Sequence, residues 1–345
     1  MINLILRAVK NEEQSTGSLR MDTIKTVLIG AGTMGRGHAA RISAYAGAKL
    51  AAVCDTSADA AKTLAKKYGA GAYSDFDIML KKEKPDAVFI CLPPFAHGGE
   101  AEACASSGAA IFMEKPLALT LERAKSICDS VEKNKSVSMI GYHQRFGGAV
   151  KKLRELIANG AAGRPCLFDA RYSCNCEGPK WWSDVNGSGG QILEQVIHTY
   201  DMAMFLMGKP SDAKAVMGNL THKDVPGYTI EDVSAAVIRF ENGALATVCA
   251  TNCAVPMRWD NPFYAVFENL TADFSDYNNA VFEFTNEKPP RAVRLSFDTD
   301  AYEAEVRHFF ECALAGRQTD CPLSEGLEGL KLVLRLIESA KKNID

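Results

Sequence analysis

The chain has 345 residues, of which 47% are hydrophobic and 23% charged, a composition typical of globular proteins that excludes disordered, collagen-like and coiled-coil classes. Its 39 basic and 42 acidic residues give a formal net charge of -3 without a basic stripe, so we expect no direct contact with nucleic acid. The longest apolar runs, such as residues 87–92, are far shorter than the roughly 20 residues that span a bilayer, and we expect no membrane span.

The length of the chain suggests two domains, because a single hydrophobic core rarely grows beyond about 250–300 residues. Residues 1–21 combine a short apolar stretch with a polar tail, which matches neither a signal sequence nor a transit peptide. We expect them to form a disordered extension that takes no part in the fold.

The eleven cysteines are scattered, most of them singly in apolar segments. Without a signal peptide, this usage indicates reduced thiols in a cytoplasmic protein. Cys174 with Cys176 and Cys249 with Cys253 come closest to the spacing of metal ligands, but neither pair is a C-x-x-C motif. We therefore expect no metal site.

Residues 22–145 alternate between short apolar or β-branched runs and helical segments, the pattern of a parallel sheet covered on both faces. Strands are expected at 25–30, 49–54, 86–91, 109–113 and 137–141, and helices near 34–46, 58–68, 75–82, 96–107 and 120–134. Thr120 is expected to cap the last of these helices, and Gly69 and Gly108 to end two others. The order predicts that residues 22–145 form an N-terminal α/β domain with a doubly wound, Rossmann-type parallel sheet.

From residue 146 the pattern changes. A helix near 146–159, a strand at 165–174, a loop rich in Gly, Pro and Trp, and a helix at about 190–207 precede successive strands, among them 231–240, 244–252, 263–269, 279–285 and 291–297. Helices near 300–315 and 324–342 close the chain, and the last is a candidate to pack back on the first domain. A run of strands after βα units predicts that residues 146–345 form a C-terminal α+β domain with a large, mostly antiparallel open sheet.

A G-x-G-x-x-G motif directly follows the first expected strand and opens the first helix. It consists of Gly30, Gly32 and Gly35, with Thr33 and Met34 between the last two glycines. The first glycine permits a tight turn, the second lets the backbone approach a pyrophosphate, and the third allows close helix packing. We expect the pyrophosphate at the helix N-terminus, where free N–H groups and the macrodipole favour an anion.

An acidic residue, Asp55, ends the second strand, where a carboxylate accepts hydrogen bonds from the adenosine ribose of a dinucleotide. This carboxylate would repel a 2′-phosphate, and no arginine follows it closely. The cofactor is therefore expected to be NAD, with NADP as the alternative.

Two loops leave the carboxyl ends of parallel strands, where ligands bind in open α/β sheets. Cys91, Leu92 and Pro93 follow the strand at 86–91, and His97 comes shortly after them. We place these residues beside the cofactor. For His97, packing against its own loop is an equally good interpretation, because the sequence shows no partner for it.

The second loop contains Glu114, Lys115 and Pro116, directly after the strand at 109–113. A lysine between a buried strand and a proline is sterically restricted, and the proline is a candidate for a cis bond. We expect Glu114 and Lys115 at the cofactor. A solvated surface lysine is the alternative when Lys115 is considered alone.

Within the expected helix at 190–207, Glu194, His198 and Asp201 are spaced to share one face of an otherwise apolar segment. Burial of three ionisable groups is costly without a purpose, so the spacing indicates a functional cluster. Two alternatives stay open: a core histidine held by Asp201, and a site for a divalent ion.

The glycine loop, the Glu114-Lys115-Pro116 motif and the segment 189–201 together resemble the glucose-fructose oxidoreductase / inositol dehydrogenase / rhizopine-catabolism (Gfo/Idh/MocA) family, over essentially residues 22–345. The resemblance implies that Lys115, Glu194 and His198 form the catalytic group beside the nicotinamide. Most members carry aspartate where this chain has Glu194. The resemblance also implies a substrate among sugars, inositols and related polyols.

Hydride transfer from a secondary alcohol requires loss of the hydroxyl proton. A histidine with a pKa near neutrality suits this step, so His198 is assigned as the general base. The Lys115 ammonium is expected to stabilise alkoxide character or to relay the proton, and Glu194 to orient the base or bind an adjacent hydroxyl. The predicted function is an NAD(P)-dependent dehydrogenase acting on CH–OH groups.

Candidate substrate-binding side chains lie in the second domain. They are Tyr172, Trp181, Trp182 and Arg258, because aromatic rings with polar tips suit a polyol or sugar. For the two tryptophans, plain packing or a contact between subunits is an equally good interpretation.

Two alternative functions remain within the family resemblance. One is a redox-neutral, NAD-dependent glycosidase or lyase, and the other is a non-catalytic, nucleotide-sensing regulator. Because Lys115 and His198 are both present, the enzyme is favoured over the regulator. A homodimer or homotetramer is expected through the exposed face of the antiparallel sheet at 231–297.

Overall fold

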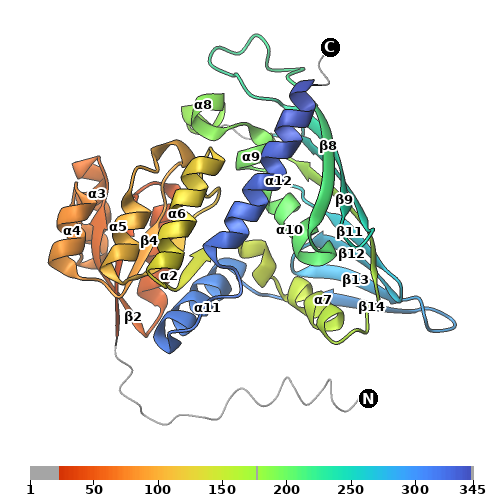
Figure 1. The fold of residues 1–345 in the computed structure, drawn as a ribbon, viewed down its shortest axis with the longest axis horizontal. Coiled ribbons are helices and arrows are strands. Elements are labelled where there is room, and N and C mark those ends of the chain that lie inside the picture. Colours follow the sequence, from red (N-terminus) through yellow and green to blue (C-terminus); the bar gives the residue numbers. More distant parts are fainter. Residues whose placement is uncertain (1–22, 176–177, 343–345) are drawn as a thin grey trace.

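The computed structural model describes residues 23–175 and 178–342 and contains two sheets with helices packed around and between them (Figure 1). The extension expected at residues 1–21, and Cys176, lie outside the described residues. Within the described part of the chain, no helix is both long enough and apolar enough to cross a membrane.

The first sheet has six strands in the order β3-β2-β1-β4-β5-β6, and all of its neighbours are parallel. The strands are β1 (Ile24–Ile29), β2 (Ala48–Cys54), β3 (Gly71–Tyr73), β4 (Ala87–Ile90), β5 (Ala110–Met113) and β6 (Ser138–Ile140). The strand order reverses between β1 and β4, and the carboxyl ends of these two strands form the switch point at which such sheets bind ligands.

Helices cover both faces of this sheet. They are α2 (Thr33–Ala44), α3 (Ala58–Tyr68), α4 (Phe76–Glu83), α5 (Glu100–Ser107) and α6 (Leu121–Lys133), with the short 3-10 turn η1 (Pro94–Ala96) before α5. The predicted end signals are confirmed: the Thr120 side chain accepts a hydrogen bond from the Arg123 N–H, and Gly69 and Gly108 end their helices in the left-handed conformation.

The second sheet has eight strands in the order β14-β13-β12-β11-β7-β10-β9-β8. Only β7 and β10 pair in parallel, and all other neighbours are antiparallel. The strands are β7 (Pro165–Ser173), β8 (Pro210–Gly218), β9 (Val233–Phe240), β10 (Leu245–Thr251), β11 (Phe263–Phe267), β12 (Leu270–Asp276), β13 (Asn279–Phe284) and β14 (Arg291–Ser296). The two sheets confirm the predicted fold class.

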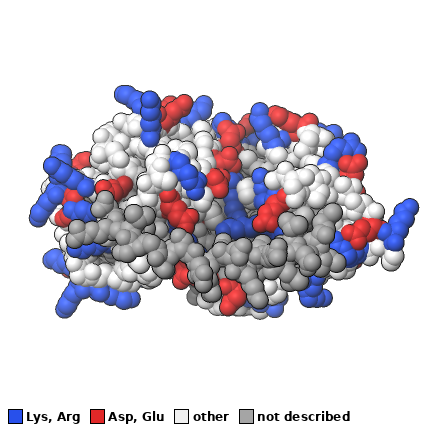
Figure 2. Space-filling view, turned by 90° about the horizontal axis from the view of Figure 1, so that it is seen from below, with Lys and Arg blue, Asp and Glu red and all other residues white. Residues whose placement is uncertain are grey.

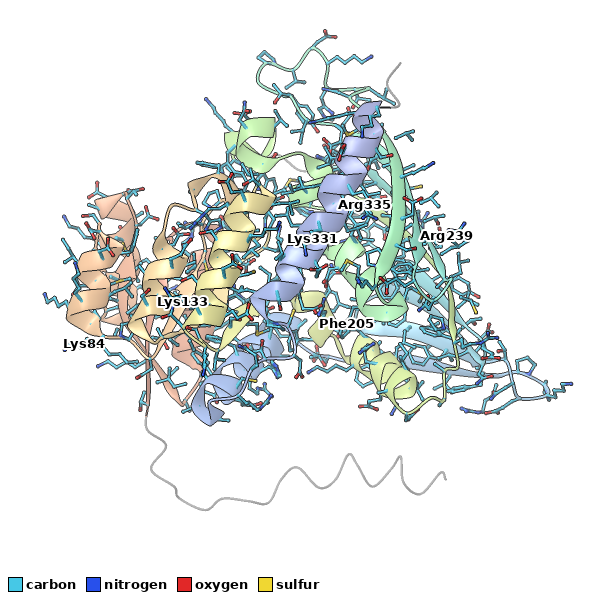
Figure 3. All side chains as sticks on the ribbon, in the orientation of Figure 1. Lys84, Lys133, Phe205, Arg239, Lys331 and Arg335 are labelled. Atoms are coloured by element: carbon cyan, nitrogen blue, oxygen red, sulfur yellow. The ribbon has the colours of Figure 1, made fainter. Side chains whose placement is uncertain are left out.

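The helices after β6 lie mainly between the two sheets (Figure 1). They are α7 (Gly148–Ala158), α8 (Val185–Ser188), α9 (Gln191–Glu194), α10 (Ile197–Met207), α11 (Ala301–Ala315) and α12 (Leu323–Lys342), with the 3-10 turns η2 (His143–Phe146) and η3 (Lys180–Trp182). On α12, Arg335 donates to the carbonyl oxygen of Ser211 in β8 at 3.0 Å (Figure 3). Leu323, at the start of the same helix, donates from its N–H to Ser138 Oγ in β6 at 3.3 Å. This helix therefore contacts both sheets.

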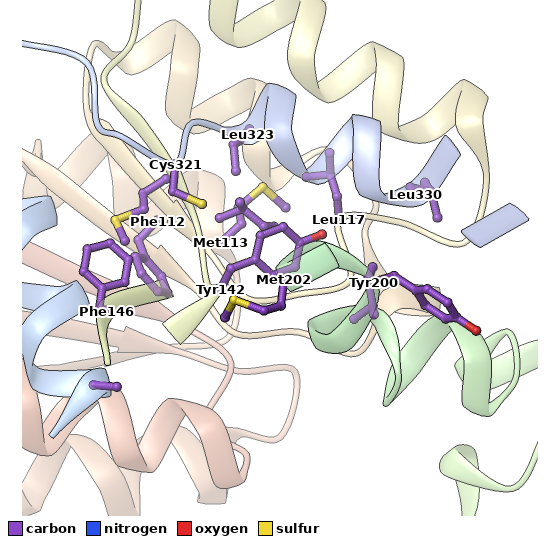
Figure 4. Close-up of a cluster of buried hydrophobic side chains, with 14 of the residues drawn as sticks. Phe112, Met113, Leu117, Tyr142, Phe146, Tyr200, Met202, Cys321, Leu323 and Leu330 are labelled. Atoms are coloured by element: carbon purple, nitrogen blue, oxygen red, sulfur yellow. The ribbon is translucent and has the colours of Figure 1, made fainter. Parts of the chain in front are cut away.

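A continuous apolar core joins the two sheets (Figure 4). Phe112 of β5 and Tyr142 after β6 are fully buried, and so are Tyr200 of α10 and Leu330 of α12. Large side chains from both halves of the chain share this core. The two sheets are therefore packed together in a fixed relative position.

The structure differs from the sequence prediction at the expected helix 190–207. Two shorter helices, α9 and α10, replace it, with a turn at Gln195 and Val196. The N–H groups of both turn residues donate to the carbonyl oxygen of Gln191, at 3.0 Å each, and regular helix resumes at Ile197. Glu194 and His198 consequently lie on two helices rather than on one regular face.

Charged side chains are interspersed by sign on the face seen in Figure 2, rather than gathered into one basic region.

Candidate functional site

The glycine motif forms the loop between β1 and α2. Gly30 has φ +98°, and a Cβ placed there would lie 2.3 Å from the carbonyl oxygen of Cys91. A Cβ at Gly35 would lie 1.9 Å from the carbonyl oxygen of Gly30, whereas a Cβ at Gly32 would meet no atom within 4 Å. The first and third glycines are therefore required for close backbone packing. The second lies beside open space at the helix start.

This open helix start fits a phosphate group. Gly32 is the N-cap residue of α2, no side chain caps the helix, and the first turn contains no acidic residue. By contrast, Ser57 and Asp75 cap α3 and α4 with side-chain hydrogen bonds. The first N–H groups of α2 are thus available to an anion, as dinucleotide binding requires.

Asp55 lies over the same loop. Its Oδ2 accepts a hydrogen bond from the Ala31 N–H at 2.7 Å, and its Oδ1 accepts one from the Ser57 N–H at 2.8 Å. The carboxylate is thereby fixed at the end of β2, next to the glycine loop, where sequence reasoning placed the ribose contact. Thr33 is exposed and Met34 is half-buried at the start of α2.

The loop after β4 runs beside the same strand ends. Cys91 is buried, and Leu92 and Pro93 are half-buried. His97 Nδ1 lies 2.6 Å from Glu100 Oε1. His97 therefore packs against its own loop, which is one of the two interpretations given above. Its buried Nε2 has no hydrogen-bond partner among the described residues.

Lys115 is held by Glu194. Its Nζ donates to Glu194 Oε1 and to the Glu194 carbonyl oxygen, at 2.8 Å each. The lysine and glutamate side chains are only 15% and 7% exposed, so water weakens this ion pair little. The Lys115–Pro116 bond is cis. Two of the three predicted catalytic residues are thus in direct contact, across the two halves of the chain.

His198 lies at the start of α10. Its ring centroid is 4.7 Å from that of His143 and 6.1 Å from that of Tyr142. Its Nδ1 is buried without a hydrogen-bond partner among the described residues. Burial, together with the neighbouring His143 and Lys115, lowers the pKa of His198 well below its usual value. The imidazole is therefore neutral at neutral pH, the form that accepts a proton.

The interpretation of His198 as a core histidine held by Asp201 is wrong. Asp201 accepts hydrogen bonds from Arg145 Nε at 2.9 Å and from Arg145 Nη2, and Arg145 Nη2 also donates to Glu325 Oε2 at 3.0 Å. Arg145 thus links η2, α10 and α12. The histidine and the aspartate of the predicted cluster have separate partners.

The candidate substrate residues are dispersed. Tyr172 is buried on β7, and Trp181 and Trp182 are half-buried on η3, with ring centroids 6.0 Å apart. The Trp181 ring also lies 6.1 Å from that of Phe95, which follows β4 in the first half of the chain. The side chain of Arg258 is 64% exposed and lies 3.9 Å from Asp260. None of its described contacts reaches Lys115 or His198.

Sequence reasoning missed two residues that shape this site. His143, three residues after the end of β6, is buried and stacks on Tyr302 with ring centroids 4.0 Å apart. Burial lowers the pKa of His143 to about 3. Its place after a parallel strand is the signal that could have identified it. Glu231 accepts a hydrogen bond from the Ile192 N–H at 2.7 Å at the start of α9, and no local motif indicates this contact.

A group outside this site, His222, Asp232 and Cys253, has potential metal-ligand atoms within 4.8 Å of one another. However, Asp232 Oδ2 already accepts hydrogen bonds from the N–H groups of Thr221 and His222 and from Thr221 Oγ1. The His222 ring nitrogen Nδ1 also lies 2.8 Å from it. These contacts anchor the loop before β9 and occupy the oxygen that an ion would need.

Comparison with known proteins identifies the family. A model described as an oxidoreductase family with an NAD-binding Rossmann fold matches residues 24–142, and a model of the GFO/IDH/MocA C-terminal domain matches residues 150–272. The chain is 31% identical over 240 residues to a D-glucoside 3-dehydrogenase from Escherichia coli, covering 64% of this chain and 68% of that protein. It is 28% identical over 326 residues to a myo-inositol 2-dehydrogenase from Thermotoga maritima, covering 92% and 95%.

Among solved structures, a levoglucosan dehydrogenase in complex with NADH and levoglucosan shares the fold. Its TM-score is 0.85 at 22% sequence identity, covering 93% of this chain and 98% of that one. The two family models together match most of this chain. The first covers the parallel sheet with the glycine loop, and the second covers most strands of the second sheet. The chain belongs to the GFO/IDH/MocA family of NAD-binding oxidoreductases.

Proposed function

We propose that this protein is an NAD-dependent dehydrogenase that oxidises a secondary hydroxyl of a sugar, inositol or related polyol, or reduces the corresponding ketone. The observation that carries the proposal is the contact between Lys115 and Glu194. It brings an ammonium group to the carboxyl end of β5, in the same sheet as the glycine loop. Support for the substrate class comes from the relatives, which are named as glucoside and inositol dehydrogenases.

The residues that would hold NAD come from the first half of the chain. The N–H groups at the start of α2 would bind the pyrophosphate, and Asp55 would bind the adenosine ribose. The loops at 91–97 and 114–115 would lie along the nicotinamide half. When bound, the cofactor supplies the redox chemistry, and the protein supplies position and charge.

His198 is the proposed general base. Oxidation of an alcohol to a ketone removes the hydroxyl proton, and a neutral imidazole can take it. Because Nδ1 is buried, Nε2 is the ring nitrogen that would meet the substrate hydroxyl. The lowered pKa of His198, caused first by burial, keeps the ring ready to accept a proton at neutral pH.

Lys115 is the proposed electrostatic partner. Its ammonium would stabilise negative charge on the reacting oxygen. Glu194 holds the ammonium by a side-chain and a backbone oxygen, so its proposed role is to fix Lys115 rather than to orient His198. This role also suits a glutamate in place of the commoner aspartate, because the longer side chain reaches the lysine.

A panel of polyols, aldoses and glycosides, assayed with NAD and with NADP, tests the proposal. Absorbance of reduced nicotinamide is followed, and substrate consumption is measured separately. Net reduction of NAD with at least one polyol or sugar supports the dehydrogenase. Consumption of a glycoside without net reduction would instead establish a redox-neutral enzyme. Tight NAD binding without any consumption would point to a regulator.

We further propose a homo-oligomer that forms through the outer face of the second sheet. Three large apolar side chains lie exposed there on neighbouring strands: Val216 on β8 at 56%, Val237 on β9 at 55% and Leu245 on β10 at 39%. The opposite face carries buried side chains such as Ala213 and Ile238. Exposed apolar patches of this kind are typical of interfaces between subunits.

A further inference from the structure

A glutamate that the proposed mechanism does not use is completely buried. Glu305 lies on α11, its residue exposure is 0%, and neither carboxylate oxygen has a hydrogen-bond partner among the described residues. An ionised carboxylate without partners in such a place is very costly. The side chain therefore requires a chemical explanation.

Glu305 faces a second carboxylate. One carboxylate oxygen each of Glu305 and Glu114 and one ring nitrogen of His38 lie within 4.8 Å of one another. All three residues are buried. Glu114 Oε1 lies 2.7 Å from His38 Nε2. Aromatic rings surround this group, since the ring of Phe112 lies 4.9 Å from that of His38 and 5.7 Å from that of Phe309 on α11.

The charges around Glu305 do not include a bonded cation among the described residues. His38, from α2, is paired with Glu114. Arg41, also from α2, lies over the Tyr302 ring at 4.5 Å. Lys115 is bonded to Glu194.

Two further titratable groups near Glu305 are Tyr302, on α11 itself, and Cys91, after β4, and burial raises the pKa of both, so both are neutral at neutral pH. His143 and Asp300 lie outside α11. His143, on η2, is neutral at neutral pH because burial lowers its pKa to about 3. Asp300, which precedes α11, adds negative charge. Burial first, and then the Glu114 carboxylate, raise the pKa of Glu305 well above its usual value.

We propose that Glu305 is kept as a neutral carboxylic acid beside the Glu114 carboxylate, and that it acts as a positioning residue for Lys115. Two buried carboxylates at this separation cannot both be ionised at low cost. Glu114 is the ionised member, because His38 is its hydrogen-bond partner and no described group pairs with Glu305.

Glu114 transmits this arrangement to the neighbouring lysine. Its Oε2 accepts a hydrogen bond from the Lys115 N–H at 3.3 Å, and a Cβ at Gly141 would lie 3.2 Å from the same oxygen. A second negative charge at Glu305 would repel Glu114 and displace the loop from which Lys115 extends. The positioning role rests on the proposed function, whereas the protonation state does not.

Infrared difference spectroscopy tests the protonation state without any substrate. The full-length wild type is compared at pH 7 with Glu305→Gln, and with the matched control Glu303→Gln, whose side chain is exposed on the same helix. We expect a carboxylic-acid carbonyl band in the wild type that Glu305→Gln removes and Glu303→Gln retains. If both variants keep the band, or if the wild type lacks it, the proposal is overturned.

Urea unfolding gives an independent measurement. An acid whose pKa is raised in the folded state loses its contribution to stability as the pH rises above the unfolded value of about 4.3. Relative to the wild type, Glu305→Gln should therefore become steadily more stable from pH 5 to pH 9. A stability difference between Glu305→Gln and the wild type that does not change with pH, or a metal ion found in the purified wild type and lost in this variant, would contradict the proposal.

The positioning role is tested by kinetics. Glu305→Ala leaves a cavity beside Glu114 at a fully buried site and so should lower kcat by about 10- to 100-fold, the scale of a displaced catalytic group, with little change in KM for NAD. Glu305→Gln should restore most of this loss, because it keeps the shape and the neutral charge. If Glu305→Ala keeps full kcat, or if Glu305→Gln fails to restore it, positioning by a neutral Glu305 is wrong even where the infrared result stands.

Discussion

Lys115 and Glu194 make two contacts with each other: the lysine Nζ lies 2.8 Å from Oε1 and 2.8 Å from the main-chain carbonyl oxygen of the glutamate. The backbone contact depends on the end of α9, and the side-chain contact on the residue type. A substitution at Glu194 therefore removes only one of the two contacts. The local fold retains the other.

Glu194→Gln should lower kcat/KM about 10- to 100-fold, because a charge-assisted hydrogen bond contributes about 1.5–3 kcal/mol. Binding of NAD, measured by fluorescence titration, should not change. Glu122→Gln, an exposed glutamate on α6, is the control. Unchanged turnover in Glu194→Gln would show that the backbone contact alone holds Lys115.

Asp55→Asn should weaken NAD binding about tenfold and reduce the preference for NAD over NADP. The substitution removes the negative charge that is expected to repel a 2′-phosphate. Calorimetric titration with both nucleotides measures the two affinities, with the exposed Asp59→Asn as control. An unaltered ratio of the two affinities would mean that Asp55 does not select the cofactor.

His143 and His198 should make stability depend on pH. Burial lowers the pKa of His143 to about 3 and that of His198 well below its usual value, so the unfolded chain binds these protons more readily. The free energy of unfolding should therefore fall as the pH is lowered from about 6.5, by at most ~1.4 kcal/mol per pH unit for each histidine. Urea unfolding between pH 7 and pH 5 should show a smaller slope for His143→Phe. If the free energy of unfolding changes equally with pH in the wild type and in His143→Phe, the pKa of His143 is not lowered in the folded state.

Arg145→Met should destabilise the fold by about 3–5 kcal/mol, because it leaves the buried Asp201 carboxylate without its cation. The two side chains are only 4% and 2% exposed. Arg164→Met is the matched control, since its ion pair with Glu268 lies at the surface and is worth less than about 1 kcal/mol. Urea unfolding measures the free energy of unfolding of both variants. Similar decreases in the two would show that burial does not make the Arg145–Asp201 ion pair more important than the exposed one.

Val237→Glu should dissociate the proposed oligomer into monomers while preserving the fold, because the charge is introduced on an exposed strand position. Light scattering at micromolar concentration gives the mass, and circular dichroism checks the fold. Lys214→Glu, at the position that pairs with Val237 across β8 and β9, is the control: it reverses a charge that the same face already carries and removes no apolar side chain, so it should disturb the oligomer less. A monomeric wild type would contradict the interface outright.

Much of the fold could be predicted because its signals are local. The apolar run of β4 is buried at every position, and Gly35 is required by its close contact with the Gly30 carbonyl oxygen, within one βα unit. The three-residue β3 was missed, because its sequence Gly-Ala-Tyr contains no β-branched residue and no buried apolar run, unlike the equally short β6. The turn at Gln195 and Val196 was missed as well, because neither glycine nor proline marks it.

The partners of the site's charged residues could not be predicted in the same way. Asp201 was considered with His198, three residues before it, but its partner is Arg145 on a distant 3-10 turn. The pairing of Glu114 with His38 likewise depends on how α2 packs against β5. Side-chain pairs between remote segments follow from tertiary packing, which spacing along one helix does not encode.

The most direct test of the proposed dehydrogenase compares NADH formation by the wild type, Lys115→Ala and His198→Ala with the polyol or sugar that the panel identifies. Binding of NAD is measured for each protein, and Lys133→Ala on α6 serves as a surface control. We expect both variants still to bind NAD, with weaker binding in Lys115→Ala than in His198→Ala, and to lose about 100-fold or more in kcat. Near-normal kcat in either variant, with NAD bound, would contradict the assignment of the catalytic group.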